Sequence, residues 1–97
     1  MKSVNPYAQR DLREFGEHVR NWRKVQNLTA DELAARADIG RSTLRDIETG
    51  RGTTQFAAVM SVITALGIDR PVVEAADPLN HDLGRMRAHL MHRERVR

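Results

Sequence analysis

The sequence contains no cysteine, so neither a disulfide framework nor a thiolate metal site can stabilise its fold. Packing has to provide the stability, as it does in most cytosolic proteins. No apolar run approaches the roughly 18 residues that a membrane-spanning helix needs, and residues 1–10 lack the apolar stretch of a signal peptide. These absences predict a cytoplasmic protein that has no membrane partner.

Signs of catalysis and of cofactor binding are equally scarce. The sequence has no HExxH pair and no phosphate-cradling glycine loop, and Gly50-Arg51-Gly52 is interpreted as a turn. His89 and His92 have a spacing that a metal site uses, with His81 nearby, but no acidic or cysteine ligand at a suitable spacing joins them. The 97 residues allow one domain with a modest core. We therefore expect no enzyme activity, no metal and no cofactor.

Aromatic residues are few, and the charge is unevenly distributed. Only 4% of the residues are aromatic, which argues against an RNA-binding module that stacks bases on aromatic side chains. Residues 85–97 contain five arginines and one glutamate, whereas residues 1–84 contain 11 basic and 12 acidic residues. The net charge of +3 therefore reflects the C-terminal tail, and a DNA interface has to be argued from particular positions.

The first helix is predicted to run from near Asp11 to Gln26, because four apolar residues share one helical face. Asn5-Pro6 offers an earlier start, since proline is tolerated in the first turn of a helix, but the apolar periodicity begins only after it. The four residues are spaced i, i+3, i+7 and i+10; they are Leu12, Phe15, Val19 and Trp22. This spacing predicts that Trp22 is part of the core.

The clearest local signal is the start of the second helix, which is predicted at residues 30–37. Thr29 can cap this helix with its hydroxyl group while Glu32 reaches back to the Thr29 amide, and this pair forms a capping box. Leu28 and Leu33 occupy the two positions of a hydrophobic staple. A short turn then leads to the next helix.

The third helix is predicted at residues 41–49 and ends at Gly50, since glycine suits the left-handed conformation that follows a helix. Leu44 and Ile47 face inward. The outer arc is polar and contains Arg41, Ser42, Arg45, Asp46 and Thr49. A fourth helix is predicted at residues 54–66, before a glycine. Its apolar stripe consists of Phe56, Val59, Met60, Ile63 and Leu66.

The pattern after this helix is less regular. Arg70-Pro71 and Asp77-Pro78 interrupt it, and residues 72–76 between them fit a short helix or a strand. From Asn80 a last amphipathic helix is predicted, with apolar residues at i, i+4, i+7 and i+11: Leu79, Leu83, Met86 and Leu90. Three methionines are expected to fill gaps between other side chains: Met60, Met86 and Met91.

A short capped helix, a turn and a second helix with a polar outer face have the spacing of a helix-turn-helix. In these residues the chain resembles the Cro and repressor-like helix-turn-helix proteins, which include the lambdoid phage repressors and are also called the xenobiotic-response-element family. The matching residues are Gly16-Glu17-His18-Val19-Arg20, Trp22-Arg23-Lys24, Leu28-Thr29, Glu32-Leu33-Ala34, Ser42-Thr43-Leu44, Ile47-Glu48, Gly50 and Ala65-Leu66-Gly67. The resemblance covers residues 12–68 without a gap. It implies an all-α, lambda-repressor-like bundle of four to five helices with a C-terminal extension.

The resemblance also implies that residues 41–49 form a recognition helix that enters the major groove of double-stranded DNA. Base contacts are implied for Arg41, Ser42, Arg45 and Asp46. Phosphate contacts are implied for residues 50–54 and for the start of the second helix. The complete set of predicted DNA-binding residues is Thr29, Gly40, Arg41, Ser42, Thr43, Arg45, Asp46, Thr49, Arg51, Thr53 and Thr54. Arg23 and Glu48 match positions that form an ion pair between the first and third helices.

Three positions depart from the family pattern. Ala30 stands where the family often has a glutamine that touches DNA, so a contact from this side chain is in doubt. Asp38 replaces a usual glycine and Gly40 replaces a usual serine cap. These two changes predict an unusual turn of the right length.

The function implied is that of a homodimeric regulator, a repressor, which binds a pseudo-palindromic operator with one recognition helix per half-site. The alternative is an antitoxin that uses the same DNA-binding domain and also binds a toxin protein. The predicted organisation is an N-terminal arm at residues 1–10, a DNA-binding domain at residues 11–68, and a region for dimerisation or partner docking at residues 69–97. A second copy or a toxin would cover the remaining apolar residues, namely Val72, Val73, Leu79, Leu83, Met86 and Leu90.

Overall fold

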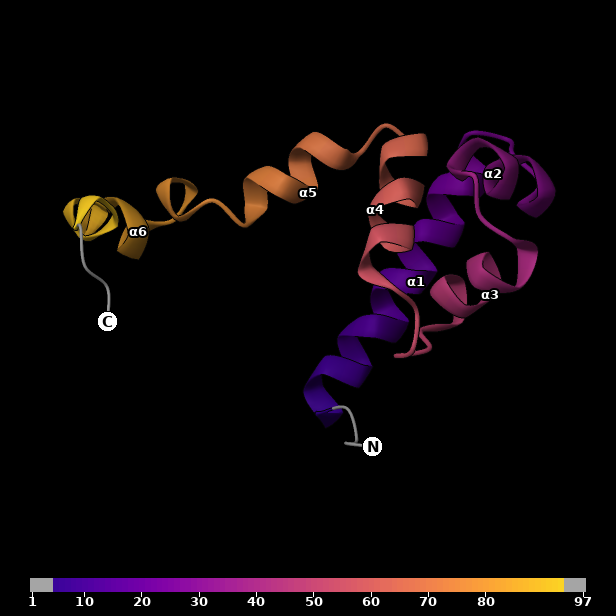
Figure 1. Cartoon of the computed structure of the whole chain (residues 1–97), viewed down its shortest axis with the longest axis horizontal. Coiled ribbons are helices and arrows are strands. Elements are labelled where there is room, and N and C mark those ends of the chain that lie inside the picture. Colours follow the sequence, from indigo (N-terminus) through magenta and orange to yellow (C-terminus); the bar gives the residue numbers. More distant parts are fainter. Residues whose placement is uncertain (1–4, 94–97) are drawn as a thin grey trace.

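The computed structural model describes residues 5–93, and over this range the chain forms only helices. They are α1 (Pro6–Val25), α2 (Ala30–Ala37), α3 (Arg41–Thr49), α4 (Phe56–Ala65), α5 (Asp69–Ala75), the short 3₁₀ helix η1 (Pro78–Asn80), α6 (Asp82–Met86) and a second 3₁₀ helix η2 (Ala88–His92). Helices α1–α4 form a bundle, and the chain continues away from it as a C-terminal arm, residues 69–93 (Figure 1). The predicted all-α bundle with a C-terminal extension is confirmed.

Helix α1 begins at Pro6, earlier than the predicted start near Asp11. The side chain of Asn5 accepts a hydrogen bond from the Tyr7 amide at 2.8 Å, and Pro6 occupies the first turn, where its missing N–H is not needed. Residues 6–10 of the expected N-terminal arm are therefore helical, and residues 1–4 lie outside the described part of the chain. Apolar periodicity missed this turn because its side chains are mostly exposed.

Helix α2 starts as the sequence predicted. The Glu32 amide donates to the Thr29 hydroxyl oxygen at 3.0 Å, and the Thr29 amide donates to the Glu32 carboxylate at 2.8 Å. The hydrogen bond from the Thr29 amide holds the pKa of Glu32 below its ordinary value, because it stabilises the charged carboxylate. Leu28 and Leu33, the two staple residues, are buried. The capping box and the staple are thus both present.

The turn between α2 and α3 explains two departures from the family pattern. Asp38 adopts the left-handed conformation, with φ 57° and ψ 47°, which aspartate tolerates better than most residues other than glycine. Gly40 is the N-cap residue of α3 and makes no side-chain capping bond. The turn therefore keeps its length while α3 starts without the usual cap.

The core lies inside the four-helix bundle, where the closest packing joins α1 to α3 and α2 to α4. Its fully buried large side chains are Val19, Leu33, Leu44, Val62 and Ile63. Gly16 is buried where α1 crosses α3, and a Cβ atom at this position would overlap the backbone carbonyls of Ile47 and Glu48. Glycine is therefore what lets the two helix backbones approach so closely.

The prediction that Trp22 belongs to the core is wrong, because its side chain is 43% exposed. The face of α1 that contacts α3 contains Gly16, Val19 and Arg23 rather than the line from Phe15 to Trp22. At 100° per residue, Trp22 and Arg23 lie on opposite sides of Val19. An arginine takes the inner position near the end of α1, and the tryptophan is displaced to the edge.

The apolar stripe predicted for residues 54–66 is only partly buried. Helix α4 begins at Phe56 rather than residue 54, and Phe56 itself is 75% exposed. Met60 is half-buried, while Ile63 and Leu66 are buried as predicted. The first turn of α4 is therefore left with an uncovered apolar edge.

The C-terminal arm differs most from the prediction. Pro71 does not interrupt a helix but lies in the first turn of α5, where proline is tolerated. The single helix expected from Asn80 is replaced by η1, α6 and η2. Met86 and Met91 fill no gap, because both are exposed. No helix within residues 5–93 is long and apolar enough to cross a membrane.

Candidate nucleic-acid interface

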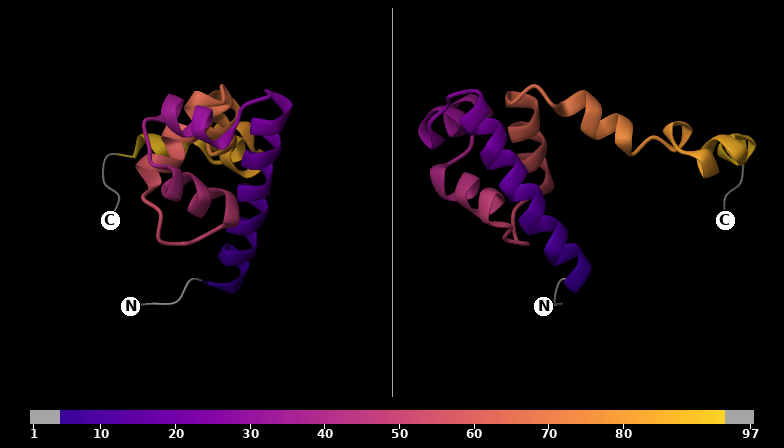
Figure 2. Two further views of the ribbon diagram at one scale, coloured as in Figure 1. Left: turned by 90° about the vertical axis from the view of Figure 1, so that its right-hand side faces the viewer. Right: turned by 180° about the vertical axis from the view of Figure 1, so that it is seen from behind.

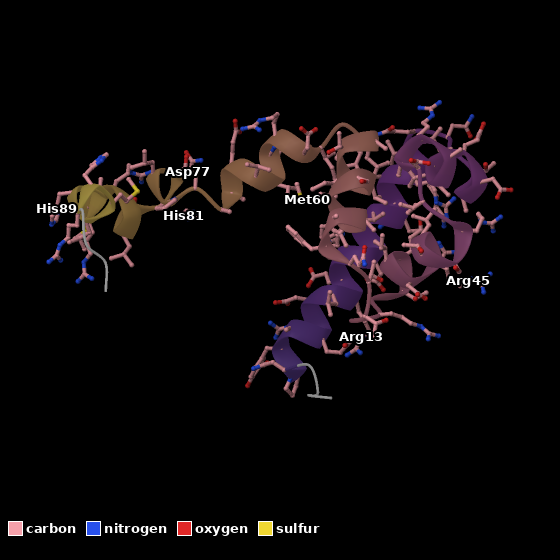
Figure 3. All side chains as sticks on the ribbon, in the orientation of Figure 1. Arg13, Arg45, Met60, Asp77, His81 and His89 are labelled. Carbon is pink, nitrogen blue, oxygen red and sulfur yellow. The ribbon has the colours of Figure 1, made fainter. Side chains whose placement is uncertain are left out.

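The outer face of α3 is polar and largely exposed. Arg41, Ser42, Arg45 and Thr49 are exposed, whereas Thr43 and Asp46 are half-buried. Figure 3 shows Arg45 projecting from α3 on the side opposite the C-terminal arm. Leu44 and Ile47, on the inner face, are buried in the core. The helix thus presents two arginines and two hydroxyl groups to solvent.

The C-terminal end of α3 is fastened to α1. Gly50 has φ 78°, the left-handed conformation that ends a helix, and a Cβ atom there would lie 2.7 Å from the Cα atom of Arg13. The side chain of Gln9 donates a hydrogen bond to the Gly50 carbonyl oxygen at 2.8 Å. Neither contact was predicted, because Gln9 lies before the periodic part of α1. Together they fix the position of α3 on the bundle.

Arg23 and Glu48 form a bidentate ion pair between α1 and α3. Arg23 Nε lies 2.8 Å from Glu48 Oε2, and Arg23 Nη2 lies 3.0 Å from Glu48 Oε1. The two side chains are only 14% and 10% exposed. The hydrogen bond to Glu48 raises the pKa of Arg23 above its ordinary value, because the carboxylate stabilises the guanidinium charge. Arg23 Nη1 also donates to the Leu28 carbonyl oxygen at 3.2 Å, which links the pair to the start of α2.

The two exposed arginines of α3 differ in their partners. Arg41 Nη1 lies 2.5 Å from an oxygen of Asp31 in the first turn of α2, and both side chains are exposed. Arg45 makes no ion pair with any residue in the described range 5–93. Asp31 was not predicted as part of the site. Its position next to Arg41 means that a ligand of Arg41 has to compete with this carboxylate.

The loop after α3 does not place all of its predicted residues at the surface. Arg51 and Thr53 are exposed, and Arg51 Nε lies 3.7 Å from the carboxylate of Asp46. The Thr54 hydroxyl oxygen is buried and has no hydrogen-bond partner within the described structure. In this conformation Thr54 is therefore not presented to an external phosphate. Thr29 and Gly40, at the starts of α2 and α3, are both exposed.

Sequence reasoning missed Arg20, which belongs to the same surface. An open cleft of about 220 Å³ lies between α1 and α3, and its lining includes Arg20, Arg41, Arg45 and Thr49. Three exposed guanidinium groups around one cleft suit an anionic ligand such as a phosphate group. Arg20 follows Gly16 by four residues, about one helical turn, so both lie on the side of α1 that faces α3. A glycine at a helix contact could therefore have indicated Arg20 from the sequence.

Within residues 5–93, no three histidine, aspartate or glutamate side chains converge as metal ligands would. The exposed polar groups of the outer face of α3 are mainly donors: the guanidinium groups of Arg41 and Arg45, together with the hydroxyl groups of Ser42 and Thr49, which can donate or accept. Such a surface can recognise hydrogen-bond acceptors and negative charge, and a helix of this kind has the dimensions of the major groove of B-DNA.

Comparison with known proteins agrees with this arrangement. A family model described as a helix-turn-helix domain matches residues 14–76. Over 54 residues the chain is 43% identical to a protein of Sinorhizobium fredii (strain NBRC 101917 / NGR234) named "Uncharacterized HTH-type transcriptional regulator y4mF". The alignment covers 56% of this chain and 71% of that protein. No solved structure shows significant similarity to the chain.

The family match starts inside α1 and ends just beyond α5, so it contains the whole turn between α2 and α3 and the helices that support it. The predicted membership among helix-turn-helix regulators is confirmed by both similarities. Because the family model spans well over half of the sequence, and most of the Sinorhizobium protein aligns with it, the chain belongs to the helix-turn-helix family of transcriptional regulators.

Proposed function

We propose that the chain is a transcriptional repressor that binds a pseudo-palindromic operator in double-stranded DNA as a homodimer, with α3 as its recognition helix. The observation that carries the proposal is the outer face of α3, where Arg41, Ser42 and Arg45 are exposed together. A guanidinium group can donate to both O6 and N7 of a guanine in the major groove, and one such pair contributes about 1–3 kcal/mol of discrimination. Family membership supports this role for α3.

The attachment of α3 to the bundle favours specific binding. Gly16, the Gln9 hydrogen bond and the Arg23–Glu48 pair all join α1 to α3, so the recognition surface moves with the core. A rigid helix loses little conformational entropy when it enters a groove. Arg20, from α1, is held beside Arg41 and Arg45 by the same contacts and is proposed to contact the backbone phosphates.

A dimer is proposed because one short helix reads too few base pairs to select a site. Two recognition helices about 34 Å apart, one turn of the duplex, reach successive major grooves on the same side of DNA. The arm leaves the bundle on the side away from α3 (Figures 1 and 2). DNA bound to α3 would therefore leave the arm accessible to a second copy.

The direct test selects duplexes from a random pool with the full chain and then measures affinity by fluorescence anisotropy over a range of salt concentrations. We expect a pseudo-palindrome with half-sites one turn apart. Arg45→Ala should weaken binding about 5- to 150-fold for the preferred base at one position and relax the preference there. Arg51→Ala should instead weaken binding to every sequence and reduce the salt dependence.

Arg36→Ala is the matched control, because Arg36 is an exposed arginine in the last turn of α2, away from the α3 cleft. This variant removes one positive charge, as Arg45→Ala does, but at a position away from the α3 surface. The preference for one base should therefore be unchanged. If Arg45→Ala and Arg36→Ala behaved alike on all duplexes, α3 would not be the recognition helix.

The second candidate is an antitoxin that binds the same kind of operator and also neutralises a toxin protein. The exposed apolar side chains of the arm favour it, because a partner protein would bury them as well as a second copy would. A toxin gene beside the gene for this chain, and a stable complex of the two purified proteins, would support this candidate. A purified chain that is dimeric through its arm without any partner would favour the repressor.

A further inference from the structure

The C-terminal arm is an ordered element that buries almost none of its side chains. From residue 73 to residue 93, every residue is exposed except Gly84 and Ala88, which are half-buried. Leu83 is 63% exposed and Met86 is 76% exposed, and both belong to the apolar series predicted from the sequence. A series of exposed large apolar side chains on one short segment indicates an interaction surface.

Side-chain contacts within the arm join η1 and α6 to the end of α5. The Asn80 side chain donates a hydrogen bond to the Glu74 carbonyl oxygen at 2.7 Å, and His81 Nε2 lies 2.6 Å from the Ala75 carbonyl oxygen. Both carbonyls belong to the last turn of α5, so η1 and α6 are fastened to that end (Figure 3). A Cβ atom on Gly84 would overlap the Pro78 carbonyl, so glycine is required for this packing. The arm extends away from its own bundle (Figure 1).

The bundle and the start of α5 form an apolar groove that residues 73–93 of the same chain do not line. This groove, of about 320 Å³, lies between α1 and α4 and is lined mainly by apolar side chains, including Leu12, Phe15, Val59, Met60 and Val72. Phe56 also lines it and remains 75% exposed. Val72 belongs to α5, so the groove opens on the side from which the arm leaves. Thr54 also belongs to its wall.

We propose that the arm of one chain packs into the α1–α4 groove of a second copy, whose arm packs into the groove of the first. The apolar residues of the arm and those of the groove are the two halves of this contact. Charge also fits. Arg87 and Arg93 of the arm are exposed, and α1 carries the exposed carboxylates of Asp11 and Glu14, which directly precede the groove residues Leu12 and Phe15 in the sequence. Arg51, which lines the groove, is paired with the carboxylate of Asp46. Two identical contacts related by a two-fold axis close the assembly as a dimer.

This exchange of arms gives the proposed homodimer a specific interface. The exchange depends on the proposed function only where a role in operator binding is concerned. The groove is also lined by residues 50–52 at the end of α3. An arm in the groove would therefore touch the segment that leads out of the recognition helix. Dimerisation and the position of α3 would then be coupled through one contact.

The test measures sedimentation of the full chain and of single variants, without DNA. Phe56→Asp changes the groove and Leu83→Asp changes the arm, and both positions are too exposed to threaten folding of a single chain. Each variant should raise the dimer dissociation constant at least about 30-fold, because a carboxylate replaces a buried apolar side chain at both contacts. The control is Val25→Asp, an equally exposed apolar position of α1 outside the groove, which should leave the dimer intact.

Mixing the two variants separates exchange from other dimers. A heterodimer of the Phe56→Asp and Leu83→Asp chains has one contact with an unchanged arm and an unchanged groove. It should form at concentrations at which each variant alone is monomeric. A dimer insensitive to Phe56→Asp would show that the groove is not part of the dimer contact, and a monomeric parent chain would show that arm and groove do not pair between copies. Either result overturns the exchange, whereas failure of the parent chain to select any duplex would overturn the proposed function instead.

Discussion

Removal of Glu48 is the most informative perturbation of this bundle. Glu48→Ala leaves the guanidinium group of Arg23 without its bidentate partner, in a position where the arginine side chain is only 14% exposed. Removing one member of a fully buried ion pair costs about 3–5 kcal/mol, because an uncompensated charge remains in a poorly solvated site. The residual exposure of Arg23 places the expected loss near the lower end, about 3 kcal/mol.

Thermal unfolding followed by circular dichroism provides the assay. For a domain of this size, 1 kcal/mol shifts the melting temperature by about 4–8 °C, so Glu48→Ala should lower it by about 12–24 °C. The matched control is Asp31→Ala, which breaks the exposed pair with Arg41 and should change the stability by less than about 1 kcal/mol. All chains have to be compared at one concentration, because dimerisation makes the melting temperature concentration-dependent.

A double variant isolates the charge effect from the loss of packing. Replacing Arg23 by methionine and Glu48 by leucine removes both charges and should recover most of the lost stability. About 1 kcal/mol should remain missing, since the Leu28 carbonyl loses the hydrogen bond from Arg23. Equal effects of Glu48→Ala and Asp31→Ala would show that the Arg23–Glu48 pair is effectively solvated, and this reasoning would be refuted.

Two further perturbations test local features of the bundle. Gly16→Ala should destabilise the chain by about 1–3 kcal/mol in chemical denaturation, because the added Cβ meets backbone carbonyls of α3 that no rotamer change can move; stabilisation, which alanine gives in an unobstructed helix, would contradict the close approach. Glu32→Gln tests the capping box: the lowered pKa of Glu32 means that its carboxylate stabilises the folded chain above the ordinary value of 4.5 and that this contribution is lost as the pH falls through the lowered value. The difference in melting temperature between parent and variant should therefore be constant above pH 4.5 and shrink as the pH falls from 4.5 through the lowered pKa of Glu32. A difference that does not depend on pH would contradict the assignment.

The parts of the fold that the sequence predicted well depend on neighbouring residues. The capping box of Thr29 and Glu32 locates the start of α2, and Gly50 locates the end of α3 through its left-handed conformation. Both helices have the predicted bounds. Such signals involve groups three or four residues apart, so no knowledge of tertiary packing is needed to interpret them.

The predictions failed where contacts between residues distant in the sequence determine which side chains face inward and where helices end. Trp22 and Arg23 are adjacent, and only the position of Glu48 on α3 determines that the arginine faces inward. Arg20 and Asp31 join the α3 surface across helix boundaries, which no local spacing reveals. In the arm, periodicity suggested one helix from Asn80, but hydrogen bonds to the end of α5 and the packing of Gly84 divide it.

The exposure of the arm has a consequence for how unfolding of this chain would be measured. The denaturant m-value grows with the surface that becomes exposed on unfolding, and α5, η1, α6 and η2 contain no buried residue. The arm of an isolated chain should therefore add helical signal to circular dichroism but little to the m-value. Its helices would lose structure gradually, ahead of the bundle. In an exchanged dimer the same residues become part of the cooperative unit, so the m-value itself would rise with protein concentration.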